Sequence, residues 1–347
     1  MKPEKEVQRT FETRRDFVRR GGFFLAGAAL GLSRGIGSSQ EKKSEETPAS
    51  RDSLPIPRSV LGRTGVEVSI LGLGTACLGH QNENNPEISK LIAVFSDAID
   101  RGINYVDTGR IYGRAEEALQ TVLKARRDKV FLVTKAWANT FGEAEKSFHE
   151  SLKKLGVDHV DVLHLHSAGD KEIDKVLGKG GSWEFMEKAK ADGKARFVGI
   201  TGHSRPANFV RLLETGKVDV MMVAMNFVDR HVYGFEEKVL PVARKHKTGV
   251  MAMKVLGGIK GGFPNYPSKT PFPAQMPREF HQRSIAYAKA LEGVTGMVIG
   301  VHSREQLLEN IQNVVATKPL APQEFEKLCE EGKALAAGWQ ARFGPVT

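Results

Sequence analysis

Gly102-Ile103-Asn104-Tyr105-Val106-Asp107 is an apolar, strand-like stretch that ends in a carboxylate. Tyr112 follows it after a short polar loop. A second stretch of this kind runs into Lys135, and a third runs into His166. Burying ionisable groups at strand ends costs free energy unless the groups pair. In a parallel α/β barrel the carboxyl ends of all strands open on one face, where the chemistry takes place. We therefore expect these four side chains to meet on that face.

Outward from this stretch, short apolar runs alternate with amphipathic segments. Eight runs have the length of strands: 70–75, 103–108, 130–135, 160–166, 196–201, 218–225, 250–254 and 297–300. The helix-like segments are 88–101, 115–125, 144–154, 182–191, 205–214, 236–247, 279–290 and 303–316. Strict alternation implies parallel pairing with right-handed crossovers. Eight repeats in about 250 residues match a closed (β/α)8 barrel, so we predict an α/β fold of this type, a TIM barrel over residues 56–340, with a C-terminal helix.

An open, doubly wound sheet is the alternative architecture. Such a sheet usually carries a glycine-rich phosphate loop after its first strand. Leu73-Gly74-Thr75-Ala76-Cys77 follows the first candidate strand and is not such a loop. The sequence therefore favours the barrel.

The four strand-end residues form a group that can reduce a carbonyl. A hydride that reaches the carbonyl carbon leaves negative charge on the oxygen, which then needs a proton. Tyr112 is the candidate acid, and the ordinary pKa of a phenol is about 10. The ammonium of Lys135 would lower that pKa, and Asp107 would keep the ammonium charged. His166 would donate a hydrogen bond to the carbonyl oxygen and orient it, or assist the proton transfer.

An ordered set of short motifs resembles the aldo/keto reductase family. They are Leu71-Gly72-Leu73-Gly74-Thr75, Val106-Asp107-Thr108 with Tyr112-Gly113, Thr134-Lys135, Asp158-His159-Val160-Asp161, Gly193-Lys194-Ala195-Arg196-Phe197-Val198-Gly199-Ile200, and Gln306-Leu307 with Glu309-Asn310. The resemblance extends from Arg58 to about Gln312. It implies a carbonyl reductase that uses a nicotinamide cofactor and no metal, with Asp107, Tyr112, Lys135 and His166 as its catalytic tetrad.

The same resemblance implies a set of cofactor contacts. They are Gly74, Thr75, Thr201, Met222, Lys254, Val255, Leu256, Gly258, Gly300, Ser303, Arg304, Gln306 and Asn310. Arg304 would reach a 2′-phosphate, which favours NADP over NAD, and the helix that opens there favours anions. The chain departs from the family where Thr201-Gly202 replaces a frequent Ser-Asn, and where Met222 and Met225 replace a Gln and a stacking ring. Trp137 is a candidate for the substrate pocket.

Two further functions are compatible with these residues. A barrel that binds nicotinamide as a sensor or scaffold, without turnover, would explain Met222 and Met225. A metal-dependent hydrolase could use His164 and His166, because alternate strand residues point to one face and histidine is a zinc ligand. His203 is the only evident later residue that could add to such a pair.

The N-terminal region predicts export. Thr13-Arg14-Arg15-Asp16-Phe17-Val18-Arg19 has the pattern of a twin-arginine signal, and residues 21–32 form an apolar run too short to span a membrane. We predict a signal peptide over residues 1–37, a disordered linker over residues 38–55, and export to the periplasm by the twin-arginine translocase, without a stable membrane span.

The composition narrows the class of partner. The formal net charge is +10, but no basic run is interleaved with aromatic residues, so nucleic acid is not expected. Cys77 and Cys329 are the two cysteines, and they suggest no disulfide framework. The expected partner of the mature protein is a small carbonyl substrate.

Overall fold

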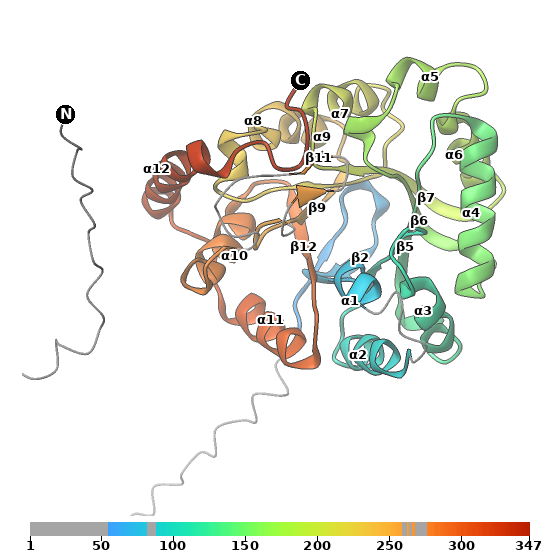
Figure 1. Cartoon of the computed structure of the whole chain (residues 1–347), viewed down its shortest axis with the longest axis horizontal. Helices are drawn as coiled ribbons and strands as arrows, with labels where there is room; N and C mark the ends of the chain where they lie inside the picture. Colours follow the sequence, from blue (N-terminus) through green and yellow to red (C-terminus); the bar gives the residue numbers. More distant parts are fainter. Residues whose placement is uncertain (1–54, 82–87, 259–261, 264–265, 268–275) are drawn as a thin grey trace, which may run out of the picture. The chain divides into compact units, whose positions relative to one another are not determined.

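The computed structural model describes residues 55–81, 88–258, 262–263, 266–267 and 276–347 (Figure 1). The predicted signal peptide, 1–37, and residues 38–54 of the predicted linker lie outside the described residues. The boundaries expected for these segments and for the barrel, 56–340, stay predictions. Among the helices of the described ranges, none is both long enough and apolar enough to cross a membrane.

Eight parallel strands close into a barrel, which confirms the predicted fold. The strands are β3 (Leu71–Gly74), β4 (Tyr105–Asp107), β5 (Phe131–Ala136), β6 (Val160–Leu165), β7 (Ala195–Gly202), β8 (Val220–Ala224), β9 (Gly249–Met253) and β12 (Val294–Gly300). Their order around the barrel follows the chain, and β12 closes the circle by pairing with both β9 and β3. Each of the eight predicted strands corresponds to one strand of the barrel.

The helices surround the barrel (Figure 1). They include α2 (Ser89–Asp100), α3 (Ala115–Leu123), α4 (Phe141–Leu155), α6 (Ser182–Ala191), α7 (Pro206–Leu213), α10 (His281–Ala290), α11 (Arg304–Ala316) and the C-terminal α12 (Pro322–Trp339). The helix predicted over 236–247 is two helices, α8 (Phe235–Lys238) and α9 (Leu240–Lys245). Pro241 explains the break, because proline has no N–H and its ring clashes with the preceding turn. Two short helices were not predicted, α1 (Ala76–Gln81) and α5 (Ile173–Leu177).

Local sequence sets the limits of α4. The Thr140 hydroxyl accepts a hydrogen bond from the Glu143 amide, and the Glu143 carboxylate accepts one from the Thr140 amide, 3.1 Å away. This capping box satisfies two amides that the first turn leaves without helical partners. Gly156 ends the helix with φ 65°, a left-handed conformation that glycine adopts without steric cost.

The interior of the barrel is filled by apolar side chains. They are Tyr105, Phe131, Val133, Val162, Val220, Met222, Met251, Met253 and Val298, with Leu61 and Val68 from the N-terminal segment. Side chains two residues apart on a strand point the same way. The candidate catalytic residues Asp107, Lys135 and His166 therefore continue the interior faces of β4, β5 and β6, at the carboxyl ends of the strands.

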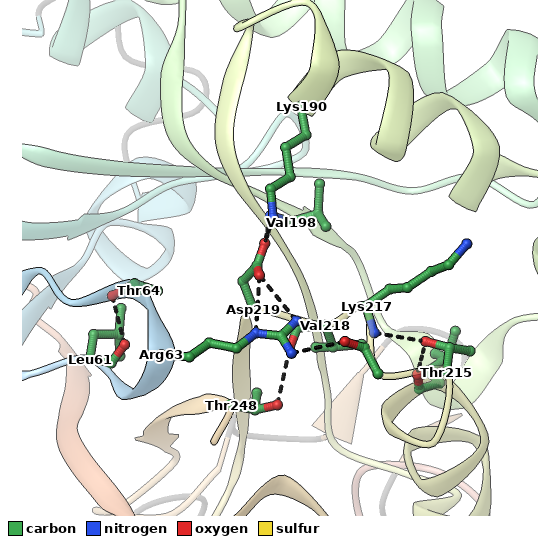
Figure 2. Close-up of polar contacts among 12 residues, drawn as sticks. Leu61, Arg63, Thr64, Lys190, Val198, Thr215, Lys217, Val218, Asp219 and Thr248 are labelled. Carbon is green, nitrogen blue, oxygen red and sulfur yellow. Dashed lines mark hydrogen bonds and ion pairs between the residues drawn. The ribbon is translucent and has the colours of Figure 1, made fainter. Parts of the chain in front are cut away.

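The opposite end of the barrel is joined to the N-terminal hairpin of β1 (Arg58–Val60) and β2 (Glu67–Ser69). Asp219 is the centre of this contact, as Figure 2 shows. Its buried carboxylate accepts hydrogen bonds from Arg63 Nε, at 3.2 Å, and from the Val198 amide, at 3.0 Å. Lys190 of α6 forms a third contact with it. One carboxylate thus links the hairpin, a covering helix and β7.

Candidate active site

A buried ion pair joins the ends of β4 and β5. Lys135 Nζ lies 2.6 Å from Asp107 Oδ1 and donates a second hydrogen bond, also 2.6 Å long, to the carbonyl oxygen of Thr108. The amide and the hydroxyl of Thr75 both donate to the Asp107 carbonyl oxygen, at 3.1 and 2.9 Å. Burial raises the pKa of Asp107 and lowers that of Lys135, and the attraction between the two charges opposes both shifts.

Tyr112 lies against this pair. It is half-buried in the loop after β4, and Lys135 Nζ is 4.6 Å from its ring centroid. Removal of water raises the pKa of the phenol well above its usual value, and the negative charge of Asp107 raises it further. The net direction of the shift is upward, opposite to the lowering expected from the charge of Lys135 alone, because burial outweighs that charge. The lysine directs hydrogen bonds at Asp107 and Thr108, and Asp107 balances its charge. The phenol therefore stays protonated at neutral pH.

His166 lies directly after β6 and faces Tyr112. The two rings are nearly perpendicular, with centroids 5.8 Å apart, and the Trp137 ring lies 5.3 Å from His166 on another side. Burial and the nearby charge of Lys135 lower the pKa of His166 well below its usual value. The imidazole is thus neutral near pH 7.

His164 lies one layer deeper in the barrel. A Cβ on Gly199 would come within 2.5 Å of His164 Nδ1, so the glycine makes room for the ring. Within the described ranges, no group of three or more His, Cys, Asp or Glu residues could hold a metal ion. The pair His164 and His166 therefore has no further ligands of these types in that part of the chain.

A cavity of about 1040 Å³ opens at the carboxyl ends of the strands. It is lined by most of the residues expected to bind substrate or cofactor: Gly74, Asp107, Tyr112, Trp137, His166, Met222, Lys254, Val255, Leu256, Gly258, Gly300, Gln306 and Asn310. Lys135 lies behind the cavity wall, where it pairs with the lining residue Asp107. Asp107, Tyr112 and His166 thus line the same cavity as the expected cofactor residues of the loop after β9, of β12 and of α11.

Four expected cofactor residues do not line this cavity. Thr75 is buried and hydrogen-bonded to Asp107, and Thr201 is buried in β7. Ser303 caps α11 by accepting a hydrogen bond from the Gln306 amide. Arg304 Nε lies 2.9 Å from a carboxylate oxygen of Asp97 in α2. In this structure these four residues lie outside the lining of the cavity and contact other parts of the protein.

The cavity suits an anionic dinucleotide. A Cβ on Gly300 would lie 2.6 Å from Cys77 Sγ, and a Cβ on Gly258 would lie 2.8 Å from the Phe343 ring. Glycine at these points lets the backbone itself form the wall. The Lys254 side chain and the N-terminus of α11 add positive potential at the same end, which favours a diphosphate.

Several cavity residues were not found by sequence reasoning. Ile111, His80, Arg278 and Phe343 line the cavity. The exposed apolar side chain of Ile111, next to Tyr112, could have been noticed in the sequence. Phe343 could not, because its position depends on long-range contacts of the C-terminal tail. The Phe343 amide donates to the Tyr233 hydroxyl, 2.8 Å away, and its ring lies 5.3 Å from that of His203.

Comparison with known proteins agrees with this geometry. Residues 70–278 match the model of the aldo/keto reductase family. The uncharacterized oxidoreductase YqkF of Bacillus subtilis is 26% identical over 305 residues, which cover 77% of this chain and 94% of that protein. The solved holo form of an aldo-keto reductase from Bacillus halodurans is 23% identical, with a TM-score of 0.60 over 79% of this chain and 96% of its own. An aldo-keto reductase solved with NADPH is 21% identical, with a TM-score of 0.60 over 79% of this chain and 87% of its own.

Proposed function

Because this chain belongs to the aldo/keto reductase family, we propose that it is an NADPH-dependent enzyme that reduces an aldehyde or ketone to an alcohol. The observation that carries the proposal is the placement of Tyr112, His166 and the pair Asp107–Lys135 around one cavity. A buried ion pair beside a protonated phenol and a neutral imidazole is an arrangement suited to proton transfer.

NADPH, when bound, would supply the hydride. Lys254, Gly258 and the N-terminus of α11 would hold its diphosphate, and Met222 would lie toward the nicotinamide. The structural relative described with NADPH supports this choice of cofactor. Arg304 remains our candidate for the 2′-phosphate, and it would have to leave Asp97 to reach it. Arg278, which lines the cavity and pairs with Glu309, is a second candidate.

The residues of the chain would handle the proton. Tyr112, protonated at neutral pH, would donate its proton to the carbonyl oxygen as negative charge develops there. Lys135 would stabilise the phenolate that remains, and Asp107 would hold Lys135 in position. His166, neutral and beside Tyr112, would donate a hydrogen bond that orients the same oxygen.

The entrance of the cavity favours a substrate with an apolar body. Ile111 and Trp137 are 51% and 42% exposed, and both line the cavity. Large apolar side chains in contact with water at a binding site gain free energy when a ligand covers them. We propose small aldehydes or ketones with an aromatic or aliphatic group as the substrate class.

We also propose that the protein is exported to the periplasm by the twin-arginine translocase. The support is the sequence Thr13-Arg14-Arg15-Asp16-Phe17-Val18-Arg19 and the apolar run after it. Because this route moves folded proteins, the enzyme would load its cofactor before export. Expression in a bacterium with an active translocase should place the protein in the periplasmic fraction, and Arg14→Lys/Arg15→Lys should keep it in the cytoplasm. Equal distribution of both forms would refute export.

A nicotinamide-binding barrel without turnover is the second candidate. Met222 lines the cavity where the family often has an amide, and Met225 is buried in the layer outside the barrel. A thioether cannot replace the hydrogen bonds of an amide. This candidate predicts cofactor binding without reduction.

One assay separates the two candidates. The protein without residues 1–37 would be mixed with NADPH and an aromatic aldehyde, with Tyr112→Phe measured in parallel. The reductase proposal expects the parent to consume NADPH. In Tyr112→Phe the rate should fall on the order of 10²-fold or more, as expected when a general acid is removed. Both proteins should bind the cofactor equally. Cofactor binding without consumption across several aldehydes would favour the binding barrel.

A further inference from the structure

A cation lies on the face of the tryptophan that lines the cavity. Lys171 Nζ is 3.7 Å from the centroid of the Trp137 ring. Lys171 is only 6% exposed, whereas Trp137 is 42% exposed. The Trp137 ring in turn lies 5.3 Å from that of His166. The Trp137 indole thus lies between the Lys171 ammonium and the His166 imidazole of the candidate active site.

We propose that Lys171 is a positioning residue that holds the Trp137 indole as the substrate-facing wall of the cavity. In this role its charge sets the affinity for apolar carbonyl substrates and leaves the chemical step unchanged. The proposal rests on the proposed reductase function for its kinetic consequence, but the contact itself can be tested without substrate or cofactor.

Hydrogen bonds hold the backbone of Lys171 in place. The Lys171 amide donates to the carbonyl oxygen of Ala168, 3.3 Å away, and the side chain of Asn208 donates to the Lys171 carbonyl oxygen at 3.4 Å. The Trp137 indole, by contrast, is 42% exposed, so water covers a large part of its surface. A cation on the ring face is an attraction that selects one orientation, and it is strongest when the cation is shielded from water, as Lys171 is.

The carboxylates around Lys171 are engaged with other groups. Asp170 pairs with Arg205 at 3.3 Å, and Glu143 accepts the amides of the α4 capping box. The Glu172 carboxylate accepts one hydrogen bond, from the Asn139 side-chain amide, and lies 3.7 Å from Lys175 Nζ.

Asp170 and Glu143 still favour the charged form of Lys171, but burial outweighs them and lowers its pKa to about 8. His166 adds no charge near neutral pH. The contact should therefore weaken as the pH rises through about 8.

Fluorescence offers a direct test, because the chain has three tryptophans and the other two, Trp183 and Trp339, are buried. Quenching by acrylamide therefore reports mainly on Trp137. In the parent, quenching should increase as the pH rises through about 8. Lys171→Met should be quenched strongly at every pH, and Lys171→Arg should remain protected well above pH 8. Trp137→Phe should abolish the pH-dependent component.

Lys175→Met is the matched control. It removes a lysine four residues away that pairs with Glu172 and does not contact Trp137. It should titrate like the parent. Quenching that is independent of pH in the parent, or equal in the parent and Lys171→Met, would overturn the proposal.

Kinetics test the consequence for substrate binding. Lys171→Met should raise KM for an aromatic aldehyde roughly fivefold at pH 7, with kcat unchanged, and Lys171→Arg should restore the parent value. A fall in kcat at constant KM would overturn the assigned role. Absence of turnover in the parent would count against the reductase function alone, since the quenching experiment decides the Lys171–Trp137 contact independently.

Discussion

The ammonium of Lys135 lies over the face of the Tyr112 ring, with Nζ 4.6 Å from the ring centroid. The same nitrogen directs its hydrogen bonds at Asp107 and at a backbone carbonyl. The lysine therefore acts on the tyrosine through space, while its position is set by an acid on the neighbouring strand. Burial, together with the negative charge of Asp107, keeps the phenol protonated although a cation is close.

Turnover should depend little on the ionisation of Tyr112 up to high pH. Because burial and Asp107 raise the pKa of this phenol, Tyr112 keeps its proton even above pH 10, the ordinary pKa of tyrosine being about 10. With saturating aldehyde and NADPH, the rate of reduction should not fall between pH 7 and pH 10. A decline with a midpoint near pH 8 at saturation would contradict the assigned protonation state.

Breaking the buried ion pair should destabilise the barrel strongly. Asp107→Asn would leave the ammonium of Lys135 buried beside a neutral partner, which we expect to lower the free energy of unfolding by about 3–5 kcal/mol. Adding Lys135→Met to this variant should recover much of the loss, because no unpaired charge remains. Urea denaturation measures both. If the double variant is less stable than Asp107→Asn, the explanation fails.

Stability should fall with rising pH because of Glu236. This carboxyl is buried and accepts a hydrogen bond from Tyr287 at 2.9 Å, and burial raises its pKa to about 8. The folded state then holds a proton that the unfolded state releases above about pH 4.5. The stabilising contribution is full below that pH and is lost as the pH rises through about 8. The slope is about 1.4 kcal/mol per pH unit within this window.

Glu236→Gln is the test of this linkage, because glutamine stays neutral at every pH. Unfolding by urea at pH 5, 6, 7 and 8 should give a smaller decrease in stability for the variant than for the parent. Parallel curves would show that Glu236 does not carry the effect. Asp229, whose pKa burial raises to about 6, is present in both proteins and should contribute equally.

Removing Asp219 should loosen the N-terminal hairpin from the barrel. Asp219→Ala leaves Arg63, Lys190 and the Val198 amide without their shared acceptor (Figure 2). We expect a loss of about 2–3 kcal/mol, because Arg63 and Lys190 can partly return to water. Asp174→Ala, which removes an exposed partner of Arg211, should cost less than about 1 kcal/mol. Equal losses would indicate that the Asp219 contacts have no special role.

The choice of cofactor should depend on one of two arginines. Arg304→Ala should weaken NADPH binding roughly tenfold and leave NADH binding unchanged, as expected for a lost contact to a 2′-phosphate. Arg278→Ala is the comparison, since it removes an arginine that already lines the cavity. If only Arg278→Ala is selective, Arg278 holds the phosphate. If neither is selective, the preference for NADPH has another origin.

Much of the fold follows from local patterns in the chain. Each of the eight barrel strands was visible as an apolar run, because a strand buried on both faces excludes polar residues. Charged residues at the ends of these strands, such as Asp107 and Lys135, indicated the candidate site, because a buried charge is costly unless it is paired. The break at Pro241 is also a local signal, because proline interrupts a helical pattern, but the predicted helix over 236–247 ran through it. The short helix α1 was missed because it is too short to show periodicity.

The sequence by itself determined the barrel and predicted the four candidate catalytic residues that the structure brings together at one end of it, because the periods of strand and helix and the cost of burying charge act along the chain. Only the tertiary structure decided the ionisation state of Tyr112, the pairing of Arg304 with Asp97 and the contact of Lys171 with Trp137. A pKa or a side-chain contact depends on every charge and dipole within a few ångströms and on how much water is excluded. These neighbours come from distant parts of the chain, and no local pattern records them.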